Sequence, residues 1–155
     1  MMFIPYKRVA IPTSLAVDEV VSRLSQSVDA RRSVWLWPWR PKSEYWGKVW
    51  PEGFQIVRSM RGRNTYLPLI TGRFTPSASG TVVTARLTLH PVAVIILATF
   101  FGSAEFLSIR AGDGYAIGLL IAFVILHCGM NLFGFYPEEK RSIDWLRNLF
   151  ANKER

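Results

Sequence analysis

The chain has 155 residues, of which half are hydrophobic and 14% are aromatic, and its net charge is +8. This length is typical of one domain, and the composition excludes a disordered or collagen-like chain. A single cysteine excludes an intrachain disulfide and a cysteine-based zinc site. A basic chain that is also this hydrophobic favours a bilayer as partner over nucleic acid, so no nucleic-acid binding is predicted.

The N-terminal part of the chain predicts a strand and then a helix. Residues 6–11 are predicted as a short strand, and residues 14–29 as an amphipathic helix, because their apolar positions recur at helical spacing. Asp18 and Glu19 fall in the first turn, where the helix dipole favours acidic side chains. The apolar positions are Val17, Val20, Val21, Leu24 and Val28.

Residues 31–43 have the most unusual composition, since five of the six tryptophans lie between positions 35 and 50. Tryptophan beside arginine and lysine is typical of a membrane interface and also of a protein–protein hot spot. A solvent-facing loop is the plainer alternative. The predicted lipid- or partner-contact residues are Arg31, Arg32, Trp35, Trp37, Trp39, Arg40 and Lys42.

A four-stranded antiparallel β-meander is predicted within residues 45–89. Turn signals separate its apolar stretches, and the last stretch alternates apolar and polar side chains as a half-buried strand does. The expected strands are 45–50, 54–60, 65–74 and 81–89.

Two apolar stretches follow, at 91–109 and 115–135, with a glycine-rich turn at 110–114 between them. About 20 apolar residues are enough to cross a bilayer core of about 30 Å, so these stretches predict a transmembrane hairpin over 91–136. Residues 1–90 hold 13 Lys and Arg against 5 Asp and Glu, which predicts that both termini are cytoplasmic. A helical hairpin buried inside a globular protein is the alternative.

Polar side chains inside the predicted spans are functional candidates. His127 and Thr99 lie at matching depths and predict a structural hydrogen-bonded pair, while a haem or chlorophyll ligand at His127 is the alternative. Glu105 lies nearer the outer end. Small residues at helical spacing predict close helix packing, either within the hairpin or to a partner. They are Ala98, Gly102, Gly114, Gly118 and Ala122.

Residues 137–155 predict a C-terminal amphipathic helix with Pro137 and two acids in its first turn. Its apolar stripe consists of Ile143, Leu146, Leu149 and Phe150. We expect this helix to pack on the sheet, because four short strands need a covering layer. The alternative is a helix that lies along the lipid headgroups.

Five pieces of the chain form the pattern GxV…FxIxR…RNxxLPxIxG…GTxV…HP, which two hydrophobic spans follow. This pattern covers about residues 45–150 and resembles a family of small uncharacterised bacterial membrane proteins. The family has no assigned activity, so the resemblance implies an architecture and no catalytic residue. The matching pieces are Trp46–Val49, Phe54–Arg58, Arg63–Gly72, Gly80–Val83 and His90-Pro91.

Together these features predict an α+β membrane protein of the bacterial inner membrane, with a basic cytoplasmic domain at 1–90, the hairpin at 91–136 and the helix at 137–155. No enzyme, metal or cofactor motif is found, so the predicted role is a non-catalytic accessory or scaffold subunit of a larger respiratory, photosynthetic or transport complex. The alternative is a membrane-anchored module that binds anionic lipid or a small ligand on its basic face.

Overall fold

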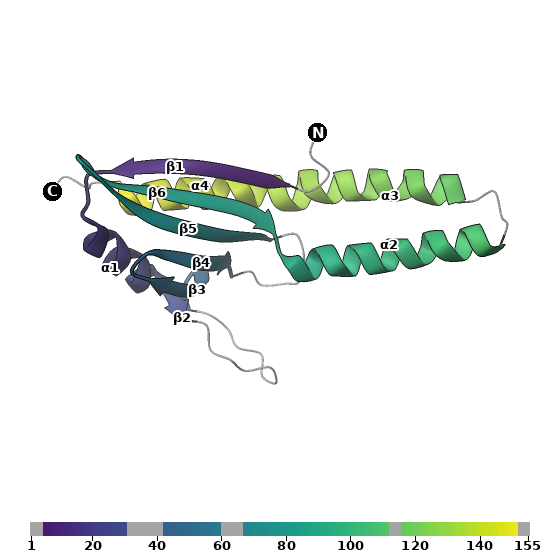
Figure 1. Ribbon diagram of the computed structural model, residues 1–155, viewed down its shortest axis with the longest axis horizontal. Coiled ribbons are helices and arrows are strands. Elements are labelled where there is room, and N and C mark those ends of the chain that lie inside the picture. The colour runs from purple at the N-terminus through teal and green to yellow at the C-terminus, as the bar shows by residue number, and fades with distance from the viewer. Residues whose placement is uncertain (1–4, 31–41, 60–66, 112–115, 152–155) are drawn as a thin grey trace.

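The computed structural model describes residues 5–30, 42–59, 67–111 and 116–151. A six-stranded sheet with two packed helices lies at one end of the molecule, and a long helical hairpin projects from it (Figure 1). The strands are β1 (Tyr6–Thr13), β2 (Val28–Ala30), β3 (Tyr45–Trp50), β4 (Gly53–Arg58), β5 (Pro68–Ser77) and β6 (Gly80–Leu89). The helices are α1 (Val17–Ser27), α2 (Pro91–Ala111), α3 (Ala116–Met130), the π-helical η1 (Asn131–Phe135) and α4 (Tyr136–Phe150).

The sheet has the strand order β1-β6-β5-β4-β3-β2. The four predicted strands are its centre, β3 to β6, and they pair as an antiparallel meander. The predicted fold class is nevertheless wrong at both edges, because β1 pairs with β6 and the short β2 pairs in parallel with β3. The sheet is therefore mixed and larger than the sequence analysis predicted.

One face of the sheet is covered by α1 and α4 and forms the core. Strand residues alternate between faces, so every second side chain points toward these helices. Val20 and Leu24 of α1 and Leu146 of α4 are fully buried against it. The prediction that the C-terminal helix packs on the sheet is confirmed. The buried strand side chains are Ile11, Val28, Tyr45, Phe54, Ile56, Ile70, Phe74, Val83, Ala85, Leu87 and Leu89.

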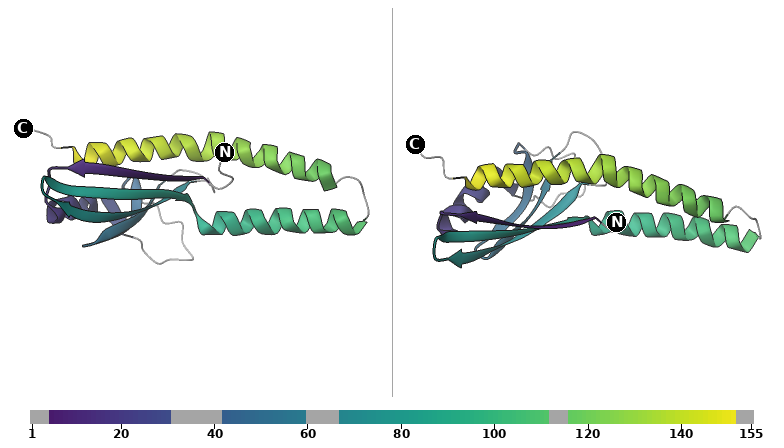
Figure 2. Two further views of the ribbon diagram at one scale, coloured as in Figure 1. Left: turned by 45° about the horizontal axis from the view of Figure 1, so that its top comes forward. Right: turned by 90° about the horizontal axis from the view of Figure 1, so that it is seen from above.

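The hairpin of α2 and α3 continues directly from the sheet. His90 alone separates β6 from α2, and α3 runs back through η1 into α4 as one nearly continuous rod along the molecule (Figure 2). In the described part of the chain, neither helix is at once long and apolar enough to cross a membrane. The regular helix of α3 ends at Met130, where the π-helical η1 begins. The apolar run of α2 is interrupted by Glu105 and Arg110.

The predicted transmembrane hairpin is therefore wrong, and several predictions that depended on it are wrong as well. They are the inner-membrane location with both termini cytoplasmic, the bilayer and a larger membrane complex as partners, and the accessory-subunit function. Two alternative functions are wrong for the same reason. They are a membrane-anchored binding module and a subunit that binds a pigment or haem through His127 inside a span. The observed elements are α+β, with a mixed sheet, a projecting hairpin and a long C-terminal helix.

Candidate functional site

The sheet face turned away from α1 and α4 carries a line of side chains that donate hydrogen bonds. In the strand register, Arg8 of β1 lies opposite Arg86 of β6, and Arg86 lies opposite Thr71 of β5. The line continues through Gln55 of β4 to Lys48 of β3. We call these five residues the basic row. It holds three cations and no carboxylate, so it attracts anions.

Arg8 and Arg86 face each other directly and are both exposed. Like charges at directly opposite positions of an antiparallel pair destabilise the sheet. Within the residues that the structure describes, neither guanidinium takes part in a salt bridge or a hydrogen bond. An anion that accepted hydrogen bonds from both groups would remove this repulsion, and guanidinium suits such bidentate contacts.

A hollow of about 970 Å³ lies over the same face. Arg8 and Arg86 line it together with Arg73 of β5. Gly53 lies between Trp50 and Arg73 in the neighbouring row, because it is the register partner of both. Gly53 is buried and places no side chain between them. The other polar side chains of the lining are Glu52, Gln55, Thr71, Thr75 and Thr84.

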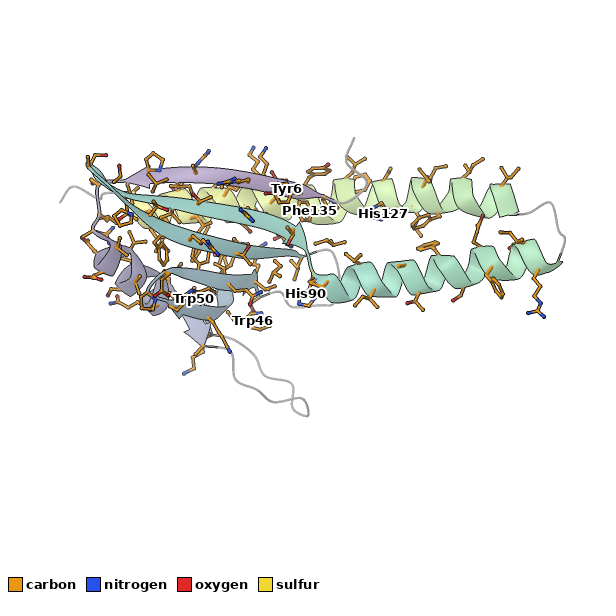
Figure 3. The ribbon with its side chains drawn as sticks, in the orientation of Figure 1. Tyr6, Trp46, Trp50, His90, His127 and Phe135 are labelled. Atoms are coloured by element: carbon orange, nitrogen blue, oxygen red, sulfur yellow. The ribbon has the colours of Figure 1, made fainter. Side chains whose placement is uncertain are left out.

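Aromatic rings border this face on two sides. Trp50 is 41% exposed and its Nε1 lies 3.4 Å from the position that a Cβ on Gly53 would take, so the ring lies beside the hollow. Figure 3 shows Trp46 and Trp50 on β3 and Tyr6 on β1, at opposite sides of the sheet. An exposed tryptophan beside cations offers a stacking surface for a planar ring.

On the covered face, a buried ion pair fixes α4 against the strands. Arg58 of β4 donates to Glu138 of α4 at 2.5 Å and to Glu44 at 3.0 Å. Arg141 also donates to Glu138, at 3.1 Å. The hydrogen bond to Glu138 raises the pKa of Arg58 above its ordinary value, so the guanidinium stays charged. The hydroxyl groups of Tyr45 and Ser142 form a further buried hydrogen bond at 3.1 Å.

Burial raises the pKa of the Tyr45 hydroxyl above its ordinary value of 10.0. The folded state therefore holds this proton at a pH where the unfolded chain has released it. The resulting stability is fully present below pH 10 and is lost as the pH rises through the folded pKa. We expect urea unfolding to show a steeper alkaline loss of stability for the wild type than for Tyr45→Phe. Parallel curves for the two proteins above pH 10 would contradict this.

The predicted contact segment lies almost entirely outside the described residues. Arg31, Arg32, Trp35, Trp37, Trp39 and Arg40 are not described, and Lys42 is exposed. The described residues on either side of it are joined, because the Ser43 backbone N–H and hydroxyl donate to the Asp29 carboxylate at 2.8 and 3.0 Å. The bond from this N–H is the main cause that lowers the pKa of Asp29 below its ordinary value. The lipid- or partner-contact role of the segment stays a prediction.

The predicted polar residues of the hairpin lie at different exposures. His127 on α3 is 5% exposed, and its ring centroid lies 5.8 Å from that of Phe123. Glu105 on α2 is half-buried, while Thr99 is exposed and its carbonyl accepts a hydrogen bond from the Ser103 hydroxyl. The pairing of Thr99 with His127 stays a prediction.

The predicted small residues face away from the rest of the described chain. Ala98, Gly102, Gly118 and Ala122 are exposed, and Gly114 lies outside the described residues. A Cβ added at Gly102 or Gly118 would meet nothing within 4 Å. These glycines therefore make no close helix contact inside the described hairpin.

Sequence reasoning did not select Arg8, Arg73 or Arg86 as site residues. The alternation along β6 already placed Arg86 on the face opposite the core. The missing information was the pairing of β1 with β6, which brings Arg8 beside it. The sequence signal that could have found the site is a basic residue at an outward-facing position in each of two predicted strands.

No protein-family model and no curated protein sequence matches the chain. The chain is similar to a Polyketide_cyc-like protein from Corynebacterium glutamicum, solved by solution NMR, with 15% identity and a TM-score of 0.32. The alignment covers 82% of this chain and 91% of that one. Similarity at this level assigns neither a fold nor a function. The resemblance to two-span membrane proteins is wrong, since no family model matches and the described helices do not qualify as spans.

Proposed function

We propose that the open face of the sheet binds a small phosphate-bearing ligand that also has a planar ring. The observation that carries this proposal is the pair Arg8 and Arg86, which has no salt-bridge partner among the described residues, at the edge of a hollow that Arg73 also lines. Three guanidinium groups suit the oxygens of a phosphate or diphosphate better than those of a single neutral ligand. The exposed ring of Trp50 lies beside the same hollow and suits a stacked ring.

The size of the hollow favours a small molecule over a polymer. Small-molecule sites usually occupy about 300–1,000 Å³, and this hollow of about 970 Å³ lies within that range. A single-stranded nucleic acid is the rival ligand, because open sheets with cations and aromatic rings also bind it. The two kinds of ligand differ in how their affinity depends on ligand length, because a polymer gains contacts with each nucleotide that the face can hold.

We propose binding without catalysis. The described lining of the hollow holds a single carboxylate, Glu52, and neither histidine nor cysteine. General acid–base catalysis needs a group that exchanges protons near neutral pH, and the arginine side chain stays protonated there. The polar groups of this face are therefore suited to holding charge and fixing orientation.

Titration calorimetry and intrinsic tryptophan fluorescence test the proposal, with adenosine triphosphate, tripolyphosphate and adenosine as probes. We expect the nucleotide to bind most tightly and adenosine least. Arg8→Ala and Arg86→Ala should each weaken nucleotide binding by about 10-fold or more, since each removes charge-assisted hydrogen bonds. Arg147→Ala is the matched control, because Arg147 is an exposed arginine of α4, outside the sheet. It should leave the affinity unchanged.

Two results would overturn the proposal. One is equal affinity in Arg8→Ala, Arg86→Ala and Arg147→Ala, which would show that the face is only a solvated basic surface. The other is a 12-nucleotide single-stranded RNA that binds about 100-fold more tightly than the mononucleotide, which would assign the face to a polymer.

A further inference from the structure

The hairpin of α2 and α3 exposes large apolar side chains on both helices. Covering one such side chain removes about 100 Å² of apolar surface from water. The largest apolar patch on a typical monomer is about 300–600 Å². The hairpin carries more exposed apolar area in total than one such patch, spread over both helices, because eight of its large apolar side chains are each more than a third exposed. They are Ile95, Phe106, Ile109, Ile117, Ile121, Val124, Ile125 and Leu126.

The two helices differ in the shape of their exposed surfaces. On α2, small side chains form a hollow of about 460 Å³ that is lined by Ala98, Thr99, Gly102, Ser103 and Phe106. On α3, Ile117, Ile121 and Ile125 follow at intervals of four residues, so they form one ridge that is 55–71% exposed. Helices pack by placing the ridge of one into the groove of another. The hollow and the ridge both remain exposed within one chain.

We infer that the hairpin docks on the hairpin of a second copy of this chain. Each copy offers one hollow and one ridge, so two copies satisfy each other and leave neither feature unmatched. An interface in which the same surface serves both partners closes as a dimer. The result is a four-helix bundle, in which apolar faces of four helices share one core.

The area available matches what such an interface requires. The smaller specific interfaces bury about 600 Å² per partner. Ile95, Phe106 and Ile109 on one side of α2 and Ile117, Ile121 and Ile125 on one side of α3 supply about this area at about 100 Å² each. The described helices also carry few charges that would oppose association, namely Glu105 and Arg110 on α2. These two charges have opposite signs, so a second copy brings as many attractive as repulsive partners.

Gly102→Leu tests the inference without weakening the monomer. A Cβ at Gly102 meets nothing within 4 Å, and leucine forms helix more readily than glycine, so the variant should fold at least as well. Its side chain fills the hollow that the ridge of the second copy needs. Sedimentation velocity should show the wild type at twice the chain mass of 17.7 kDa, and Gly102→Leu with a dissociation constant at least 10-fold higher. Ser25→Leu, an exposed position of α1, is the control and should sediment as the wild type does.

A second variant tests the ridge. Ile121→Lys with Ile125→Lys places two charges on it and should give a monomer with the same far-ultraviolet circular dichroism. The inference is overturned if the wild type stays a monomer at all concentrations, including a monomer that is recovered only as one chain per detergent micelle. It is also overturned if both variants dimerise as tightly as the wild type.

Discussion

Replacing Glu138 by alanine should lower the free energy of unfolding by about 3 kcal/mol. The Glu138 side chain is 7% exposed and pairs with both Arg58 and Arg141. Its removal leaves the Arg58 guanidinium, which is 19% exposed, with Glu44 alone. Breaking a buried ion pair costs about 3–5 kcal/mol because the remaining charge is still buried, and the second partner of Arg58 places the effect at the low end.

Urea unfolding of Glu138→Ala checks this value, and Asp144→Ala is the control. Asp144 lies on the same helix and pairs with Arg147 at 4.0 Å, but both side chains are more than half exposed. Its loss should cost less than about 1 kcal/mol, as for other surface pairs. The double replacement Arg58→Met with Glu138→Met should be less destabilising than Glu138→Ala, because it leaves no buried charge. Similar costs for Glu138→Ala and Asp144→Ala would contradict the prediction.

The sequence predicts the helix position of Glu138 but not its ion-pair partner. Pro137 and two following acids predicted the start of a helix, and α4 does carry Glu138 and Glu139 in its first turn. The helix dipole explains an acid at that position but does not predict its partner. Arg58 belongs to β4, and only the packing of α4 across the sheet brings the two together.

Local patterns predicted the elements better than their pairing. The alternation of apolar and polar residues predicted β6, and helical spacing predicted the buried positions Val20 and Leu24 of α1. The pairing of β1 with β6 joins the first and the last strand of the sequence, and no local signal specifies it. The three-residue β2 is too short to show any periodicity, so the parallel edge was missed.

The apolar stretches were misassigned because hydropathy along a sequence does not reveal where a regular helix ends. The hydropathy of 115–135 predicts one span, whereas α3 ends at Met130 and a π-helical turn leads into α4. Phe135, counted inside that span, is fully buried against the sheet domain core. Part of the apolar character of this stretch therefore serves the packing of α4 on the sheet.

The candidate site was missed for a related reason. Trp and Arg density drew attention to residues 31–42, because composition is visible in a linear sequence. The basic row is instead built from one residue in each of five strands, and no two of them are sequence neighbours. A site made by register appears only when the strand order is known.

Replacing Gly72 by alanine should destabilise the protein, and the cost should depend on Phe54. The two residues are register partners on β5 and β4, and a Cβ at Gly72 would lie 2.1 Å from an atom of the Phe54 ring. This ring is fully buried and packs on Phe74 with a centroid distance of 5.6 Å, so it has little room to move. Overpacking of this kind costs about 1–3 kcal/mol, and we expect the upper part of that range.

A double-mutant cycle with Phe54→Ala isolates the cause. Phe54→Ala alone should cost about 3–5 kcal/mol through the cavity that it leaves. In that background the ring is gone, so adding Gly72→Ala should cost almost nothing, which corresponds to a coupling energy of about 2 kcal/mol. Gly129→Ala is the control, because a Cβ there meets nothing within 4 Å. Since Gly72 and Phe54 also lie under the hollow, Gly72→Ala should weaken nucleotide binding too. An equal cost of Gly72→Ala with and without the Phe54 ring would show that the glycine is required for its backbone and not for the space it leaves to that ring.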